Sequence, residues 1–475
     1  MKYDVIIIGA GVIGSAIARK LSQYKLKILV LEKENDVCEG TTCANSAIVH
    51  SGYDPEPNTL KAKLNVLGNK MYDQLCDELD VQFRRNGSIT LANDVEEITI
   101  LEMLYERGKQ NGVEVHLLER DELIKIEPNI TKKVKKGLFA PSAGIVNPFE
   151  LNIALMENAI DNGVELSLKN EVKKIQKVDD IYLVTTSITT YQTNYLINAS
   201  GVYADIISGF VNDSYFTIMP RKGEYYLLDH FDNNFIRHTL FNVPSSKGKG
   251  VIVAPTTSYN YIVGPSSDFI DSRDDVSTTM TSLNEIKEKA KDLVDYIDYS
   301  KQIREFSGIR AVSSTSDFVI DSPQKGFINV AGIQSPGLTA APAIAEMVSE
   351  MIENKELKEN YNPRRRPVIR MKNLSIDEKN EVIKKDNRYG RIVCRCEKIS
   401  EGEIVDCIKR NCGATTIKGV KKRVRAGFGK CQGGFCEGEV LKILARELGK
   451  NPEEIEYAKT NSKILIHELG GQNNE

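Results

Sequence analysis

The feature that most constrains the fold of this chain is a glycine-rich turn near its N-terminus, at residues 9–14 (GAGVIG). An apolar run at residues 4–8 precedes the turn and predicts a strand that is buried on both faces. Helical spacing follows over residues 15–24, and a second apolar strand at residues 27–31 ends at Glu32. Strand, turn, helix and strand form a βαβ unit, so the chain is expected to begin with a parallel, Rossmann-like α/β domain.

The three glycines of this turn each have a physical role in holding a dinucleotide. Gly9 permits the tight turn, Gly11 lets the backbone approach a pyrophosphate, and Gly14 allows the helix to pack closely on the strand. Free N–H groups at the helix N-terminus attract the phosphates. Glu32 can accept hydrogen bonds from ribose hydroxyls and would repel a 2′-phosphate, which argues against NADP. The alternative is an ordinary glycine turn, and the motif alone does not separate FAD from NAD.

A second glycine-containing turn lies more than 300 residues further along the chain, at residues 332–339 (GIQSPGLT). It follows a predicted strand at residues 326–332 and opens a predicted helix at residues 340–353. A helix N-terminus built in this way can present N–H groups to a flavin ring or ribityl chain. An NAD-only enzyme has no evident need for it, so the turn favours FAD. A plain strand–turn–helix is the alternative.

The overall composition excludes several classes of protein. The chain has 475 residues and a formal net charge of −3, so nothing global suggests a nucleic-acid partner. No apolar run reaches the roughly 18 residues that a membrane helix needs. The N-terminal apolar run lacks the basic region of a signal peptide. We therefore expect a cytoplasmic location and no transmembrane segment, and a peripheral association with a membrane through partner proteins stays open.

Six of the nine cysteines lie between residues 394 and 436. The odd number and the expected cytoplasmic location argue against a disulfide scaffold. Four thiolates can bind zinc or a [2Fe–2S] cluster. The spacing C-x-C at residues 394–396 is unusual for a zinc site, and glycines near residues 431–436 let backbone N–H groups point at sulfur. The pattern favours a cluster, although zinc stays open.

Residues 1–353 resemble the D-amino-acid-oxidase-type family of FAD enzymes. The matching segments are the first turn with Glu32, residues 41–52, residues 198–205 and the second turn. The resemblance implies that one FAD is held by residues from all of these segments, with a backbone group of Val172 against the adenine. The implied contacts are Gly9, Gly11, Gly14, Glu32, Thr41, Thr42, Asn45, Ser46, Val172, Gly201, Gly332, Gly337, Leu338 and Thr339.

Residues 391–445 resemble the small, helical [2Fe–2S] domain of the bacterioferritin-associated-ferredoxin-like (BFD-like) family. The match rests on the C-R-C-E string, a helix from Ser400 and residues 415–434. The resemblance implies that the cluster ligands are Cys394, Cys396, Cys431 and Cys436. The basic run at residues 421–425 either stabilises an anionic cluster, meets a partner protein or is a solvated face.

Together these resemblances imply a mixed α/β and α+β architecture. Residues 1–80, 146–214 and 306–353 are expected to form the Rossmann-like FAD-binding domain. A β-rich substrate domain is expected to be inserted into it as residues 81–145 and 215–305. A polar, proline-bearing stretch predicts a linker at residues 354–390. The [2Fe–2S] domain follows at residues 391–445, and residues 446–475 form a polar tail.

A flavin dehydrogenase needs little acid–base machinery: a base can take the hydroxyl proton, and a cation orients the anionic group of the substrate. His50 lies in a segment that the resemblance places near the flavin, so it is the candidate base; a cofactor contact is the alternative. Arg310 is the first candidate for anchoring an anionic substrate, because the family carries a similar Gly-x-Arg near the flavin. Arg221 is the second candidate and Arg304 the third. Cys38 and Cys43 are interpreted as packing thiols.

An oxidase-type domain followed by this cluster domain resembles the large subunits of anaerobic glycerol-3-phosphate dehydrogenases. The resemblance implies that sn-glycerol 3-phosphate is oxidised to dihydroxyacetone phosphate by hydride transfer to flavin N5. Electrons would leave through the cluster to partner redox subunits or a quinone-linked acceptor. Residues 45–50 and 221–226 resemble the L-2-hydroxyglutarate branch, so a dehydrogenase of a small anionic hydroxy acid is an alternative. Amino- or imino-acid oxidation and a non-catalytic electron-transfer or iron-sensing module also stay open.

Overall fold

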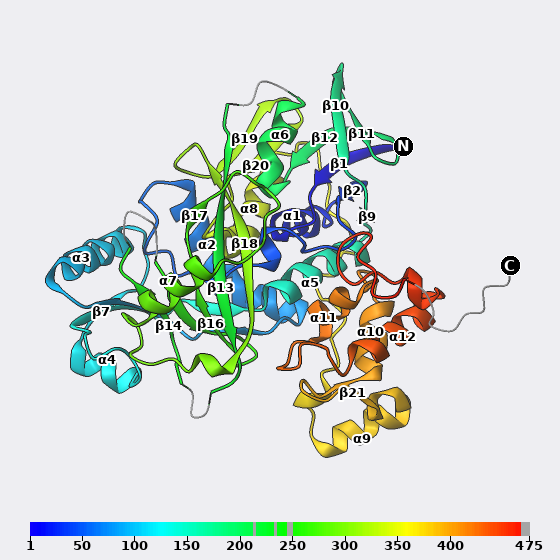
Figure 1. Ribbon diagram of the computed structural model, residues 1–475. Coiled ribbons are helices and arrows are strands. Elements are labelled where there is room, and N and C mark those ends of the chain that lie inside the picture. The colour runs from blue at the N-terminus through cyan, green and yellow to red at the C-terminus, as the bar shows by residue number, and fades with distance from the viewer. Residues whose placement is uncertain (212–214, 232–234, 245–249, 467–475) are drawn as a thin grey trace.

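Two large β-sheets and a small C-terminal helical unit organise the chain (Figure 1). The computed structural model describes residues 1–211, 215–231, 235–244 and 250–466. In Figure 1 the first sheet lies at the upper right, the second sheet occupies the centre and left, and the C-terminal unit lies at the lower right beside helix α5 (Pro148–Asp161). None of the helices within the described residues combines the length and the apolar composition that a bilayer crossing requires.

The first sheet has eight strands and contains the βαβ unit predicted from the sequence. Strand β1 lies at its centre and pairs in parallel with β2 and β12, while β9 extends the parallel part beyond β2. Strand β12 pairs antiparallel with β11 along its first half and parallel with β20 along its second half. The strands are β1 (Lys2–Ile8), β2 (Ile28–Leu31), β9 (Glu165–Ser167), β10 (Val172–Val178), β11 (Ile181–Thr186), β12 (Thr190–Asn198), β19 (Val319–Gln324) and β20 (Phe327–Ala331).

Helices pack on this sheet through their apolar faces and form the largest hydrophobic core of the chain. Helix α1 contacts both α5 and α8, and α8 also contacts α2. The apolar run of β1 is buried, as predicted, because helices or strands cover both of its faces. The helices are α1 (Val12–Leu21), α2 (Leu60–Leu79), α5 and α8 (Gly337–Glu350). The packing of α1 against α8 brings together the two glycine turns, which precede these helices.

The second sheet has nine strands and is assembled from two separate parts of the chain. Strands from residues 88–140 join strands from residues 218–313 through the parallel pairing of β5 with β14. Helices α3 (Val95–Gln110), α4 (Arg120–Ile126) and α7 (Met280–Ala290) accompany it. The strands are β5 (Ser88–Ala92), β6 (His116–Glu119), β7 (Lys136–Ala140), β13 (Ile218–Leu228), β14 (Thr239–Asn242), β15 (Ile252–Pro255), β16 (Tyr261–Gly264), β17 (Asp268–Phe269) and β18 (Gln302–Ser313).

The charged segment at residues 95–128 does not form one continuous helix. Helix α3 ends at Gln110, because Gly112 adopts a left-handed φ of +71° that stops it. The chain then alternates apolar and polar residues into the edge strand β6, which pairs with β7. The charged composition of this segment hid the change from a period of 3.6 to a period of 2.

Smaller elements complete the chain. A three-stranded sheet is formed by β3 (Ile48–Val49), β4 (Phe83–Arg84) and β8 (Gly144–Val146). The C-terminal unit has its own hydrophobic core, and its last long helix spans residues 437–448. The unit and the segment before it contain α9 (Ile376–Lys385), β21 (Ile392–Cys394), β22 (Ile399–Ser400), α10 (Glu401–Lys409), α11 (Ile417–Val424) and α12 (Glu437–Leu448). The domain boundaries given above stay a prediction.

A buried ion cluster joins the C-terminal unit to the loop that follows β2. Arg423 donates to both carboxylate oxygens of Asp36 at 2.8 and 2.9 Å. Lys422 lies 2.9 Å from Asp36 and 2.7 Å from Glu39. All four side chains are at most 5% exposed. Burial alone would raise the pKa of Asp36, but the charges of Arg423 and Lys422 hold it well below its usual range. For these two cations, the hypothesis of a solvated basic face is wrong.

Replacing Asp36 by asparagine is expected to destabilise this contact strongly. Arg423 and Lys422 would lose the carboxylate they share, and breaking a buried ion pair costs about 3–5 kcal/mol. We expect a loss of about 3 kcal/mol in the free energy of unfolding, measured by urea denaturation, and faster proteolysis within residues 354–390. The control is Asp180→Asn, whose pairing with Lys325 at 3.4 Å is solvent-exposed and is worth about 0–1 kcal/mol. Equal losses of unfolding free energy in Asp36→Asn and Asp180→Asn would contradict the role of the buried ion cluster.

Candidate functional site

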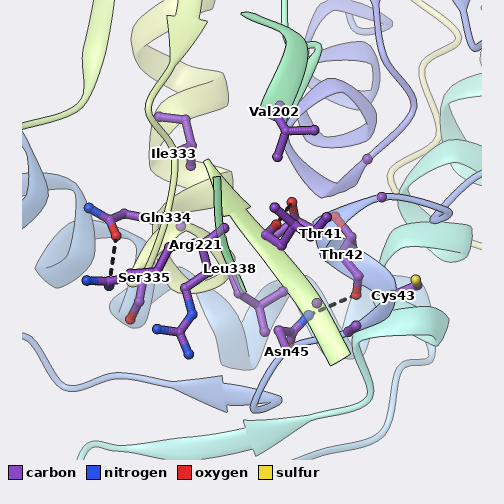
Figure 2. Close-up of a pocket in the computed structure, with 18 of the residues that line it drawn as sticks. Thr41, Thr42, Cys43, Asn45, Val202, Arg221, Ile333, Gln334, Ser335 and Leu338 are labelled. Atoms are coloured by element: carbon purple, nitrogen blue, oxygen red, sulfur yellow. Dashed lines mark hydrogen bonds between the residues drawn. The ribbon is translucent and has the colours of Figure 1, made fainter. Parts of the chain in front are cut away.

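A cavity of about 950 Å³ lies where the two large sheets meet. It is lined by the first glycine turn, by residues 39–50, by strands β13 and β18, and by the second glycine turn. Figure 2 shows this convergence: Thr41, Thr42 and Asn45 lie on one side, and Ile333, Gln334 and Leu338 on the other. The size is at the upper end of the range for ligand sites, as a dinucleotide requires.

The first glycine turn has the backbone geometry that its sequence predicts. Gly9 has a φ of +104°, and a Cβ atom at Gly14 would lie 1.9 Å from the Gly9 carbonyl oxygen. Gly9 and Gly11 line the cavity, while Gly14 lies behind them in the contact between helix and strand. The carboxylate of Glu32 also lines the cavity and accepts hydrogen bonds from the N–H groups of Ala10 at 2.8 Å and Glu34 at 3.0 Å. Burial raises the pKa of Glu32.

The segment at residues 41–46 connects the first turn to the second sheet. The hydroxyl of Thr42 accepts a hydrogen bond from the N–H of Val12 at 3.1 Å, and the Thr42 carbonyl accepts one from Asn45 Nδ2 at 2.8 Å (Figure 2). Thr41 donates its hydroxyl to a β18 carbonyl at 2.7 Å. Ser46 Oγ lies 3.3 Å from the hydroxyl of Tyr225 on β13. These contacts place the segment along the cavity wall.

His50 lies between the second turn and the cavity. Its backbone N–H donates to Thr339 Oγ1 at 2.8 Å, and its ring Nε2 is 3.2 Å from Ser335 Oγ. The ring also packs against Phe241 with a centroid distance of 5.9 Å. Helix α8 begins at Gly337, so its N-terminal N–H groups open toward the same space.

The structure brings most of the predicted cofactor contacts to this one cavity. Three of the fourteen lie outside its lining. Gly14 and Gly332 shape the backbone of the two turns, Gly332 with a φ of +65°. Thr339 is buried and accepts a hydrogen bond from the backbone N–H of His50. The lining residues are Gly9, Gly11, Glu32, Thr41, Thr42, Asn45, Ser46, Val172, Gly201, Gly337 and Leu338.

Two arginines meet in the cavity without a neutralising carboxylate. Arg221 on β13 is directly opposite Arg310 on β18 in the antiparallel register, and both line the cavity. Neither forms an ion pair within the part of the chain that the structure describes. Burial, followed by the charge of Arg310, lowers the pKa of Arg221. Arg221 donates to Gln334 Oε1 at 3.4 Å (Figure 2), while its Nε is buried without a hydrogen-bond partner. Arg304 does not line the cavity; its charge acts on Lys421 of the C-terminal unit.

Sequence reasoning missed two glycines that make room for this arrangement. A Cβ atom at Gly223 would lie 2.7 Å from Arg310 Nη2, and one at Gly308 would lie 2.2 Å from the carbonyl oxygen of Ala44. Both glycines lie inside strands, where glycine often marks a close approach of another group. That signal was present in the sequence, but it does not say which group approaches.

The four cysteines predicted as cluster ligands lie as two pairs. Cys396 Sγ is 3.7 Å from Cys431 Sγ. Cys394 and Cys436 share a hydrogen bond that, together with backbone N–H groups, lowers the pKa of Cys394 to about 6. Two thiol pairs suit the two irons of a [2Fe–2S] cluster, which four cysteine thiolates hold.

Backbone N–H groups point at these thiols, as the glycine content predicts. Gly427 and Glu397 donate to Cys394, and Gly433 and Phe435 donate to Cys431. Such donors favour the thiolate form that binds iron. By contrast, burial raises the pKa of Cys407 to about 12 and that of Cys412 to about 11, so both are neutral packing thiols.

Aromatic side chains fill the space between the cavity and the cysteine pairs. Tyr225 lines the cavity, and its ring stacks on Phe306 at 4.8 Å with an interplanar angle of 8°. Phe428 of the C-terminal unit packs in the same hydrophobic cluster. The Phe428 carbonyl accepts a hydrogen bond from Gln432 Nε2 at 3.0 Å, beside Cys431. Phe428 therefore links the hydrophobic cluster at the cavity wall to the loop that carries Cys431.

Comparisons with known proteins agree with this division. The family model described as FAD dependent oxidoreductase matches residues 4–351, and that described as BFD-like [2Fe-2S] binding domain matches residues 392–446. A glycerol 3-phosphate dehydrogenase of Caloramator mitchellensis is 49% identical over 98% of each chain. A glycerol 3-phosphate oxidase of Mycoplasma genitalium is 35% identical over 76% of this chain and 97% of its own. The solved FAD-bound L-alpha-glycerophosphate oxidase of Mycoplasma pneumoniae matches with a TM-score of 0.74 and 30% identity, covering 78% of this chain and all of its own.

Removing one thiol from each pair tests the ligand set. We expect Cys396→Ser and Cys394→Ser each to lose most of the iron and acid-labile sulfide, since all four thiolates are needed to hold the cluster. Cys412→Ala should keep both, because its neutral thiol lies outside the two pairs. The measurement is iron and sulfide per chain after anaerobic purification, with bound flavin as the internal reference. Full iron content in Cys396→Ser would refute the ligand assignment.

Proposed function

We propose that this chain, which belongs to the family of FAD-dependent oxidoreductases, oxidises sn-glycerol 3-phosphate to dihydroxyacetone phosphate. Electrons then leave through the [2Fe–2S] domain to a redox partner. The observation that carries the proposal is the pair Arg221 and Arg310, two cavity guanidiniums without a carboxylate partner among the described residues. Relatives named glycerol 3-phosphate dehydrogenase and oxidase support the same substrate.

The charge of the arginine pair favours a phosphate over a single carboxylate. A phosphate monoester carries about −1.5 to −2 charges at pH 7, and guanidinium groups bind it through parallel hydrogen bonds. Two adjacent, partly buried cations therefore match one phosphate group. A single carboxylate would leave one of the two charges uncompensated in a partly desolvated site. This is the reason to rank L-2-hydroxy monocarboxylic acids and amino or imino acids below glycerol 3-phosphate. L-2-Hydroxyglutarate carries two carboxylates, so against it the proposal rests on the relatives named glycerol 3-phosphate dehydrogenase and oxidase.

The residues of the cavity fit the FAD that the family uses. Gly9 and Gly11 leave a cradle free of side chains at the N-terminus of α1, where pyrophosphate binds. Glu32 presents a carboxylate for ribose hydroxyls, and α8 presents its N-terminus from the opposite turn. When bound, FAD supplies an acceptor for two electrons and one hydrogen from the substrate carbon. The chain itself supplies orientation, through Arg221 and Arg310, and exclusion of water.

We place His50 as the group that takes the hydroxyl proton of the substrate. It lines the cavity, and its ring is held by the contacts to Ser335 and Phe241. A positioned base of this kind contributes about 10²–10⁴-fold to a rate. The hydrophobic cluster that holds Tyr225, Phe306 and Phe428 supports electron exit toward the cysteine pairs. All nine cysteines are free, which supports a cytoplasmic, reducing location.

Anaerobic reduction of the bound flavin tests the substrate. We expect glycerol 3-phosphate to bleach the flavin at concentrations where L-2-hydroxyglutarate, L-lactate, sarcosine and proline do not. Arg310→Gln should raise the half-saturating concentration of glycerol 3-phosphate about 100-fold, or about 2.7 kcal/mol. Arg364→Gln is the control, because Arg364 is exposed and pairs only with an exposed Asp77. If L-2-hydroxyglutarate bleaches the flavin at a lower concentration than glycerol 3-phosphate does, the substrate is the hydroxy acid and the proposal is wrong.

A separate substitution tests whether His50 acts as a base or only contacts the cofactor. We expect His50→Gln to slow flavin reduction by about 10²-fold or more while FAD retention and the half-saturating substrate concentration change little. His116→Gln is the matched control, since His116 is exposed, lies 3.0 Å from Glu114 and stacks on Phe139, outside the cavity lining. Stopped-flow absorbance gives the rate, and flavin per chain gives retention. Loss of flavin with an unchanged rate in the remaining holoenzyme would make His50 a cofactor contact.

A further inference from the structure

We propose that the exposed edge of the cluster site is the docking surface for a small acidic electron-carrier protein. We call this surface the cluster edge and define it by Arg395, Cys396, Lys398, Lys430 and Phe435. The inference rests on the proposed function only in that electrons pass through the cluster; it does not depend on the identity of the substrate.

Phe435 is the apolar centre of the cluster edge. It lies between Cys431 and Cys436, its backbone N–H points at the Cys431 thiol, and its side chain is 89% exposed. No other large hydrophobic side chain among the described residues has a higher exposed fraction. A phenyl ring held in solvent beside a redox centre contributes little to the core of its own chain. Aromatic side chains are typical anchors of protein interfaces.

The thiol pair nearest to Phe435 is also open to solvent. Cys396 is exposed, and Cys431 is only partly buried. Cys394 and Cys436, the other pair, are buried. The site is therefore asymmetric, with one pair facing the hydrophobic core of the unit and the other facing outward. A partner that covers Phe435 reaches the outward pair directly.

Three exposed cations lie in the loops of the cluster edge. Arg395, Lys398 and Lys430 are exposed, and none forms an ion pair within the part of the chain that the structure describes. The acidic neighbours contact other groups. Glu397 pairs with Arg425 at 2.8 Å, and Asp229, on which the charge of Lys430 acts, hydrogen-bonds to His230 at 2.8 Å. Glu437 accepts a hydrogen bond from the Tyr457 hydroxyl at 3.5 Å, and its charge acts on the buried Lys421. This basic rim is found on a chain whose net charge is −3.

An apolar anchor within a basic rim specifies the chemistry of the partner. Complementary charges steer association and accelerate encounter at low salt. Electron-transfer complexes are typically small and transient, below about 1,200 Å² of total buried area, which suits one exposed ring and three flanking cations. These features favour a small acidic carrier protein over a permanent subunit or a second copy of this acidic chain.

The test uses the full-length holoenzyme and two protein probes of opposite charge. A pre-reduced, acidic plant-type ferredoxin is mixed with oxidised enzyme, so that one electron leaves the ferredoxin cluster and reduces the cluster of this chain. In a parallel experiment, basic cytochrome c takes one electron from the dithionite-reduced enzyme. Stopped-flow absorbance gives the second-order rate constant of each reaction as a function of salt concentration.

We expect the rate constant with ferredoxin to fall steeply with salt, and Phe435→Ala to lower it about tenfold. The double substitution Arg395→Glu with Lys430→Glu should lower it at least tenfold and reverse its salt dependence, while the reaction with cytochrome c becomes faster. Tyr296→Ala and Lys325→Glu are the controls, because both residues are highly exposed and lie in other elements. Both should match the wild-type chain.

Iron content and flavin reduction by glycerol 3-phosphate are measured on every variant. If Phe435→Ala loses iron, the charge-reversal variant and the salt dependence still decide the question. Unchanged ferredoxin rates in the charge-reversal variant, or equal changes in Lys325→Glu, would overturn the proposal. A wild-type dimer that becomes monomeric in Phe435→Ala, seen by sedimentation, would assign the surface to a second copy and would also overturn it. Failure of flavin reduction alone would affect only the proposed substrate.

Discussion

At Gly14 a Cβ atom would lie 1.9 Å from the carbonyl oxygen of Gly9, so α1 reaches β1 only because this position has no side chain. The close contact sets the direction of α1 and points its N-terminal N–H groups at the cavity. Because α1 also packs on α8, the same contact sets where the second glycine turn lies. The FAD cavity therefore depends on one backbone approach that only glycine permits.

The second sheet adds a cavity wall that carries positive charge for binding the substrate. Strands β13 and β18 pair along their whole length, and their register places Arg221 opposite Arg310. Like charges side by side are unfavourable in the free enzyme, and burial, followed by the charge of Arg310, lowers the pKa of Arg221. An anion that binds between the two arginines relieves their repulsion, and this relief contributes to its binding free energy. The pairing register of β13 and β18 sets up this arrangement.

The C-terminal unit is held against this framework by charge as well as by apolar contact. Asp36 and Glu39 lie in the loop just before the cavity segment at residues 41–46, and they pair with Lys422 and Arg423. These buried ion pairs therefore position the C-terminal unit, and with it the cysteine pairs, relative to the cavity. Buried ion pairs add little net stability but are strongly unfavourable when broken, so they specify one docked arrangement.

The sequence by itself determined the elements whose signals are local. Both glycine turns and β1 follow from spacing within a few residues, and the cofactors follow from a resemblance spread over the chain, whereas the thiol pairs Cys396–Cys431 and Cys394–Cys436 form only in the tertiary structure. Only the tertiary structure decided which arginines reach the cavity, because Arg221 and Arg310 meet through a strand register that local sequence does not encode, whereas Arg304 on the same strand lies elsewhere. It also decided that Lys422 and Arg423 are buried, because the sequence of a basic run does not show whether water or a distant acidic loop surrounds it. Periodicity reports how a segment is built, but the partner of each charge is set by contacts between residues hundreds of positions apart.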